Sequence, residues 1–266
     1  MRSVALAVLL AVPALRVLRG QTPAEPTIVL TFYGGAVTGH ALWAVGRQPL
    51  CRYVGGTCGS GSVYDTVSVS RSIGSSLGAG LTMTYFLRSA VGVQLDVSFL
   101  GLPFENHCAP IGALSADNQA LCGSIPANNR ESSALSFELG VIARTPARTS
   151  TLRPYARLGI GLLSYSGSTV ELEGSYPPPQ GTKIVIADDN PARSSVSFFG
   201  GVGLLANLSP GYVFRLEARD VYARLMRVDG PASDLAVAPI SGHFFHDLAL
   251  SIGFGIVLEH KRGRRY

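Results

Sequence analysis

The sequence predicts an all-β fold, an eight-stranded antiparallel up-and-down transmembrane β-barrel with four long extracellular loops. Three observations support this prediction. Most of the chain alternates apolar and non-apolar residues with a period of two, as β-strands do. Hydrophobic residues make up 47% of the chain and charged residues only 15%, against about 25% charged residues in ordinary soluble domains. Finally, no apolar run reaches the roughly 18 residues that a membrane-spanning helix needs, so strands must account for the apolar excess.

Eight alternating runs predict the eight strands. Within residues 77–99, Leu81 and Leu95 belong to an apolar set, whereas Thr82, Gln94 and Asp96 belong to a set of glycines, hydroxyls and few charges. A set that faced water in a soluble sheet would be rich in Lys, Glu and Asp, and neither set is. An apolar outside around a polar inside is typical of a transmembrane barrel, whose closure pairs the backbone groups in lipid. The runs are residues 28–33, 77–87, 91–99, 135–143, 155–165, 195–207, 212–222 and 247–258.

The connections between these runs alternate in length. Short ones are expected at Arg88–Ser89, at residues 145–153 and at Ser209–Gly211, the last a turn signal. Long ones follow the first, third, fifth and seventh strands and contain all four cysteines. Because every second connection is long, all long loops lie at one end of the barrel. By analogy with outer-membrane barrels, that end is expected outside the cell and both termini in the periplasm.

The two ends of the chain are interpreted as separate from the barrel. Residues 1–20 are predicted to be a signal peptide, because Arg2 precedes an apolar stretch over residues 4–15. Residues 21–26 form a Pro-containing spacer, residues 27–260 the barrel, and residues 261–266 a basic tail. Export fits a location in the bacterial outer membrane, with outer-membrane lipids as the first partner.

The net charge of +5 does not indicate nucleic-acid binding. Of the 22 Lys and Arg residues, three lie in the signal peptide and four in the tail, which leaves 15 against 17 acidic residues. The body of the protein is therefore slightly acidic. It has no basic stripe interleaved with aromatic residues, which a nucleic-acid groove requires.

The cysteines are predicted to form two local disulfides, Cys51 with Cys58 and Cys108 with Cys122. Four cysteines allow three pairings, and proximity in sequence favours this one. Disulfides belong to an oxidising compartment, in agreement with export. A zinc site is the alternative, but the spacings lack a C-x₂-C knuckle and no histidine lies near Cys51. No metal and no cofactor are predicted.

The charged residues on the polar face are predicted to lie in the lumen. Their mixed signs indicate a paired network, because an unpaired charge in a narrow barrel is costly. Such a network would plug the lumen, since side chains just fill an eight-stranded barrel; an ion path lined by the same residues is the alternative. Many lumen glycines would make room for the long side chains. The network residues are Asp96, Glu138, Arg144, Arg157, Arg215, Glu217, Arg219 and Asp247.

No catalytic residue is predicted. His243, His246 and Asp247 lie near Ser251 in sequence. By the alternation His246 faces lipid and Ser251 faces the lumen, so they do not form a Ser–His pair. Aromatic residues at the strand ends are expected to form the two interfacial belts of a membrane protein. These residues are Tyr85, Phe86, Tyr155, Tyr212 and Phe214 at one end, and Phe99, Tyr165, Phe198, Tyr222, Phe244 and Phe245 at the other.

The pattern of strands and loops, with phrases such as RPYARLGIGLL and FRLEARD, resembles the small eight-stranded outer-membrane barrels of the OmpA, OmpX and OmpW type. The resemblance covers residues 27–258. It implies a lumen plugged by charges. The first hypothesis for the function is a non-enzymatic surface or envelope barrel, inserted by the barrel-assembly machinery, whose disulfide-stapled loops contact an extracellular partner.

Three other functions stay open at this point. A small-solute or ion channel of porin type would use the same fold. A soluble lipocalin-like barrel would need the apolar set turned inward and a charged exterior, and the candidate exterior is largely glycine. An outer-membrane lipid-modifying enzyme would need a catalytic group that the alternation does not provide.

Overall fold

The computed structural model describes residues 27–54, 57–58, 64–87, 89–129, 131–146, 151–178, 181–186, 194–209, 211–224 and 244–258. The predicted signal peptide (1–20), the spacer (21–26) and the basic tail (261–266) lie outside these residues, as do Arg88 and His243. Within the described part of the chain, no helix is long and apolar enough to cross a membrane.

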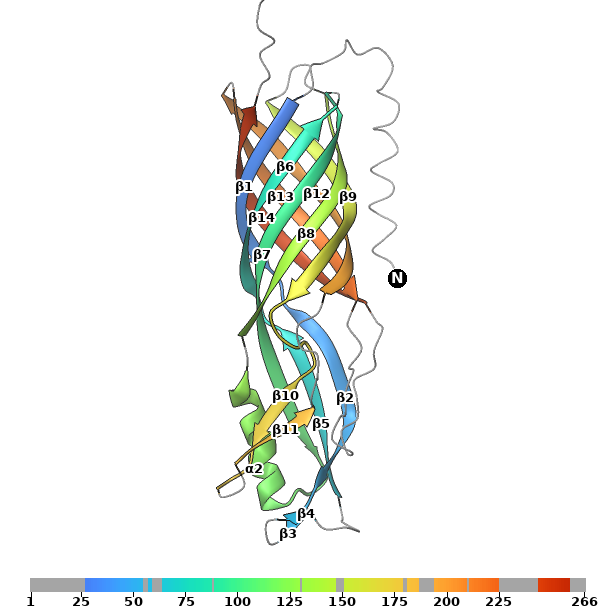
Figure 1. Ribbon diagram of the computed structural model, residues 1–266, viewed down its shortest axis with the longest axis vertical. Helices are drawn as coiled ribbons and strands as arrows, with labels where there is room; N and C mark the ends of the chain where they lie inside the picture. Colours follow the sequence, from blue (N-terminus) through green and yellow to red (C-terminus); the bar gives the residue numbers. More distant parts are fainter. Residues whose placement is uncertain are drawn as a thin grey trace, which may run out of the picture.

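Eight long strands form a closed antiparallel ring (Figure 1). Each strand pairs with the next around the ring, and the last strand pairs with the first along ten residue pairs, from Ile28↔Leu258 to Val37↔Ala249. All eight predicted strands are confirmed. In order around the ring they are β1 (Thr27–Val37), β6 (Ser76–Phe86), β7 (Val91–Ile111), β8 (Glu131–Arg144), β9 (Leu152–Tyr165), β12 (Ser194–Ser209), β13 (Tyr212–Arg224) and β14 (Phe244–Leu258).

The apolar set of each strand lies on the outside of the ring and the polar set inside. Leu95 is 48% exposed and Ile252 58%, whereas Gln94 is 2% exposed and Thr82 fully buried. Alternate residues of a strand point to opposite faces, so this difference between neighbours fixes which face is outside. The large exposed side chains of the belt are mostly Leu, Ile, Val and Phe.

The described parts of the first three segments predicted as long connections contain regular secondary structure. A second sheet stands at one end of the barrel, made by β2 (His40–Cys51), β5 (Tyr64–Ile73) and the part of β7 beyond Pro103. It is followed by α2 (Ala116–Ser124) and η2 (Ile125–Asn128), and β10 (Leu172–Ser175) and β11 (Thr182–Ile186) form a hairpin beside them (Figure 1). We call these elements together the outer lobe. Two short strands, β3 (Tyr53–Val54) and β4 (Thr57–Cys58), pair near its tip.

The outer lobe is built around a hydrophobic core. Val67 and Val69 of β5 are fully buried, as are Leu121 of α2 and Ile125 of η2. The core also contains Trp43, whose indole Nε1 donates a 2.9 Å hydrogen bond to the Thr169 carbonyl. A buried core of this kind makes the lobe a folded unit instead of a set of flexible loops.

The disulfide Cys108–Cys122 ties β7 to α2, as predicted. Cys51 is also disulfide-bonded; the side chain of its predicted partner, Cys58, lies outside the described residues. Both cysteines of the described bridge belong to the outer lobe, so the bridge staples the lobe and not the barrel.

Candidate functional site: the lumen charge cluster and the outer lobe

Six of the eight predicted lumen charges converge at mid-height in the barrel. Asp96 comes from β7, Glu138 from β8 and Arg157 from β9, and the other three, Arg215, Glu217 and Arg219, alternate along β13. We call these six residues the lumen charge cluster. Three carboxylates face three guanidinium groups, so the cluster carries no net charge when all six are ionised.

The six side chains form one continuous set of ion pairs. Arg157 bridges two carboxylates, with 3.2 Å from its Nη1 to Asp96 Oδ2 and 2.7 Å from its Nη2 to Glu217 Oε1. Arg219 bridges Glu138, at 2.9 Å, and Asp96, at 3.8 Å. Arg215 pairs with Glu217 on the same strand. Each arginine therefore has a carboxylate partner, as buried charges require.

Four neutral side chains donate further hydrogen bonds to these carboxylates, among them the Ser136 hydroxyl to Glu138 Oε1 at 3.2 Å. The Tyr33 hydroxyl donates to Asp96 Oδ1 at 2.5 Å, and Thr82 donates to Asp96 Oδ2 at 2.7 Å. The Tyr155 hydroxyl donates to Glu217 Oε2 at 2.6 Å and accepts from Arg215 Nε at 2.7 Å.

The predicted aromatic belts need three corrections. Tyr155, Phe86 and Tyr165 are buried inside the barrel and not in an interfacial belt. Tyr155 stands two residues before Arg157, so the alternation places both on the same face. That signal was available in the sequence and was outweighed by the position of Tyr155 near a strand end. The side chains of Phe244 and Phe245 lie outside the described residues.

Apolar side chains pack in the lumen on both sides of the charge cluster. Toward the short-turn end, Val29, Phe86, Ile142, Leu205 and Val213 pack together with Tyr155. Toward the outer lobe, buried residues such as Leu100, Leu163, Phe199 and Val221 belong to the core that continues into the lobe. As a result, the side chains of the cluster are between 1% and 5% exposed.

Glycines on neighbouring strands admit the bulky lumen side chains. A Cβ atom on Gly203 would stand 2.6 Å from the Tyr155 hydroxyl and 2.3 Å from the Leu216 carbonyl oxygen, and one on Gly80 would stand 2.5 Å from the Tyr33 hydroxyl. Real Cβ atoms do not approach other atoms this closely, so the tyrosines reach the cluster because these positions lack a side chain.

Two predicted members of the network lie outside the cluster. Arg144 is at the short-turn end, where its Nε donates to the Ser89 carbonyl at 2.9 Å and its guanidinium lies 3.4 Å from the Phe86 ring centre. Asp247 is at the opposite end, 3.1 Å from His40 Nδ1. Both side chains lie on the lumen face of their strands, as predicted. The alternation of a strand predicts only the face of a residue and not its height in the barrel.

Buried polar residues hold the outer lobe together. Arg71 of β5 donates to Asn106 at 2.8 Å, to the Ser168 carbonyl at 3.2 Å, and to the Glu171 carbonyl. Its guanidinium also lies 4.9 Å from the Phe104 ring centre. This arginine therefore anchors the segment that follows β9 against the lobe sheet.

Asp65 organises the start of α2. Its Oδ2 accepts hydrogen bonds from the Ser115 backbone and hydroxyl, both at 2.7 Å, and from the Asn118 amide at 2.9 Å, while Arg52 contacts Oδ1. Burial alone would raise the pKa of Asp65, but these hydrogen bonds, first among them the one from the Ser115 backbone, hold that pKa well below its usual range.

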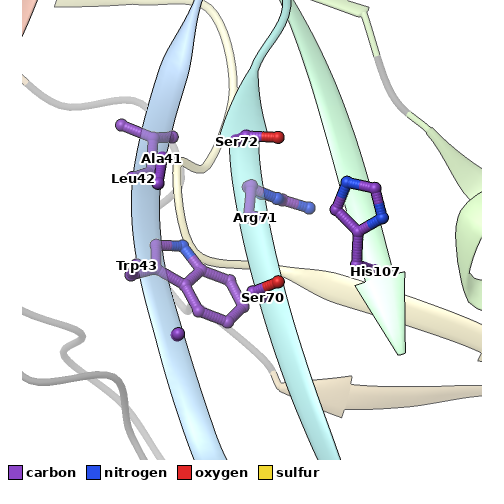
Figure 2. A pocket seen from close by; sticks show the side chains of 8 residues that line it. Ala41, Leu42, Trp43, Ser70, Arg71, Ser72 and His107 are labelled. Carbon is purple, nitrogen blue, oxygen red and sulfur yellow. The ribbon is translucent and has the colours of Figure 1, made fainter. Parts of the chain in front are cut away.

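The lobe sheet contains an open hollow of about 610 Å³, lined by both buried and exposed residues. Figure 2 shows its three strands side by side, with Trp43 on β2, Arg71 on β5 and His107 on β7. The hydroxyls of Ser70 and Ser72 also line the hollow. Within the described residues, no three His, Cys, Asp or Glu side chains gather closely enough to hold a metal ion.

The closed ring, its apolar exterior and its polar interior together decide the class of the protein. The chain is a transmembrane β-barrel of the outer-membrane type. Outer-membrane barrels also have an even number of antiparallel strands, with short turns at one end and long connections at the other, as this chain does.

The sequence matches no protein family and no curated protein. In structure the chain is similar to the outer-membrane protein OprG of Pseudomonas aeruginosa, with a TM-score of 0.46 and 16% identity over 90% of this chain and 98% of that one. It is similar to the Neisserial surface protein NspA, with a TM-score of 0.39 and 10% identity over 89% and 99% of the two chains. It is also similar to the outer-membrane protease OmpT of Escherichia coli, with a TM-score of 0.44 and 7% identity over 90% and 99%. The assignment above depends on strand pairing and on the exposed residues, not on these distant similarities.

Proposed function

We propose that this outer-membrane barrel is a non-enzymatic surface protein whose lumen is closed and whose outer lobe contacts a partner outside the cell. The observation that carries the proposal is the burial of the lumen charge cluster. In a water-filled channel the charged side chains of the wall are solvated, whereas the side chains of this cluster are at most 5% exposed.

The outer lobe supports the second half of the proposal. A barrel that served only as a membrane anchor would need only short loops. Here the lobe has a core, a disulfide and a buried arginine anchor, so it holds a fixed surface on the extracellular side. Binding surfaces are commonly placed on connections that a rigid scaffold positions. Insertion by the barrel-assembly machinery and contact with outer-membrane lipids are part of the same proposal.

The non-enzymatic role is supported by the placement of the candidate catalytic residues. His246 is exposed on the outside of β14, whereas Ser251 is on the opposite face of the same strand. A nucleophile and its base must lie within hydrogen-bond reach of one another.

A narrow channel is the second candidate. Both amide atoms of Gln94, the Arg157 Nε and the Ser197 hydroxyl are buried in the lumen and make no hydrogen bond within the described residues. Atoms of this kind are usually satisfied by water, which favours a thread of water molecules between the side chains.

Conductance across a planar lipid bilayer distinguishes the two candidates. We expect the purified wild-type protein to show no stable open state. Glu217→Ala should produce openings, because it removes the carboxylate shared by Arg157, Arg215 and Tyr155, while Glu105→Ala in the exposed part of β7 should behave as wild type. Sustained single-channel currents from wild type would reject the closed lumen and establish the channel.

A further inference from the structure

The barrel and the outer lobe meet at a histidine–aspartate pair. His40 is the first residue of β2, three residues after β1 ends at Val37. Its Nδ1 lies 3.1 Å from Asp247 Oδ1 on β14, and the two side chains are 19% and 8% exposed. The connection between β1 and β2 is fixed to the barrel, because the Thr38 backbone N–H donates to the Leu248 carbonyl at 2.8 Å.

A second pair adjoins the first on the outside of the barrel. His246 Nδ1 lies 3.4 Å from Asp220 Oδ1 of β13. The centre of the His246 ring lies 5.8 Å from that of the His40 ring and 5.8 Å from that of the Tyr222 ring, and both contacts are stacked. The two pairs therefore form one contiguous set, with one histidine contributed by the lobe and the other three charged groups by the barrel.

The charge of this set depends on the imidazoles. Among the described residues, neither Asp247 nor Asp220 forms an ion pair with a Lys or Arg side chain, so with neutral imidazoles the set carries two negative charges. Asp247 is mostly buried, and a buried carboxylate without a counter-charge is costly. Three other titratable groups of the described residues lie near the set. Tyr165 of β9 is near Asp247, and Tyr222 of β13 is near Asp220. Glu105 of β7 is near Gly74, the residue after Ile73, which pairs with His40.

We propose that these two pairs form a proton-dependent clasp that holds the outer lobe against the barrel more firmly as the pH falls. An imidazole ordinarily takes up a proton between about pH 5 and 8. Protonation gives each carboxylate a cation at contact distance and brings the set from two negative charges to none. An open arrangement would separate the protonated imidazole of His40 from Asp247 and so lose their ion pair. Lowering the pH therefore shifts the population toward the clasped state.

Hydrogen exchange of the full chain in lipid vesicles tests this clasp. Exchange of the backbone amides of β2 and β5 is measured at pH 5.5 and 7.5 and corrected for the intrinsic effect of pH. We expect wild-type amides in both strands to exchange about fivefold more slowly at pH 5.5, an effect of the size of one well-placed ion pair. This pH range is above the one in which Asp65 takes up a proton.

Two variants and a matched control assign the effect. His40→Gln and Asp247→Asn each remove one member of the first pair and should abolish the pH response. His107→Gln removes an exposed histidine of the same lobe and should retain it. Heat-modifiable migration on gels shows whether each variant is folded, and either first-pair variant alone decides the result. The proposal is overturned if wild type shows no slowing at pH 5.5, if a folded first-pair variant keeps the wild-type response, or if His107→Gln loses it.

Discussion

Asp96 and Glu138 stand directly opposite one another across β7 and β8, with both carboxylates in the lumen. Like charges at such a cross-strand position destabilise a sheet. The guanidinium of Arg219, reaching across from β13, lies 2.9 Å from Glu138 and 3.8 Å from Asp96. This pair of carboxylates is therefore stable because a strand from the other side of the barrel supplies the cation between them.

Removal of that cation should be strongly destabilising. Arg219→Met leaves Glu138 buried without its partner, and breaking a buried pair in this way costs about 3–5 kcal/mol. The measurement is urea unfolding from lipid vesicles. Arg224→Met, at the exposed end of the same strand, is the control and should change stability little. The double variant Arg219→Met with Glu138→Leu should recover much of the loss, and a double variant as unstable as the single one would contradict this explanation.

Position 203 should not tolerate a side chain, whereas position 200 should tolerate one. Both glycines are on β12, but a Cβ atom on Gly203 meets Tyr155 and the Leu216 carbonyl, and one on Gly200 has nothing within 4 Å. We expect Gly203→Ala to lose about 1–3 kcal/mol by overpacking and Gly200→Ala to be neutral in the same urea assay. Equal effects would show that the lumen is not packed around Tyr155.

Reduction of the Cys108–Cys122 disulfide should loosen the lobe and leave the barrel intact. The bridge spans 14 residues, and closing a loop of that length is worth about 3 kcal/mol in the chain-entropy description. In Cys108→Ala with Cys122→Ala, limited proteolysis should cut faster near α2, while the folded barrel still migrates as a heat-modifiable band. Loss of that band would mean that the bridge stabilises the barrel itself.

Acid should release the start of α2. The folded protein holds the pKa of Asp65 below its ordinary value of 3.8. The carboxylate therefore stabilises the folded state at pH values above 3.8, and this stabilisation is lost as the pH falls below 3.8 toward the lower pKa of the folded protein. Amides of residues 115–121 should therefore exchange faster as the pH is lowered from 5 to 2, after correction for intrinsic rates. In Asp65→Asn they should exchange fast already at pH 5. An unchanged acid response in this variant would assign the effect to another group.

Much of the barrel could be predicted from the sequence, and most of the outer lobe could not. Alternation fixes a face, so Leu95 and Gln94 were assigned to opposite sides correctly. It does not fix depth, which is why Arg144 and Asp247 were grouped with Arg157 although they lie at opposite ends of the lumen. The lobe was missed because β2 has two register shifts that interrupt its period and because Ser68 and Ser70 give β5 the composition of a loop. The contacts of Tyr33 with Asp96 depend on long-range closure of the ring, which no local pattern reports.

The central claim is that the apolar face of the barrel lies in lipid. Leu95 is in the middle of the exposed belt of β7, and His107 is exposed on the same strand in the outer lobe. An arginine that faces lipid near the bilayer midplane costs about 2–4 kcal/mol, whereas one that faces water costs little. Urea unfolding from lipid vesicles should show that loss for Leu95→Arg and almost none for His107→Arg. If Leu95→Arg is as stable as His107→Arg, the belt does not face lipid and the chain is not a membrane barrel.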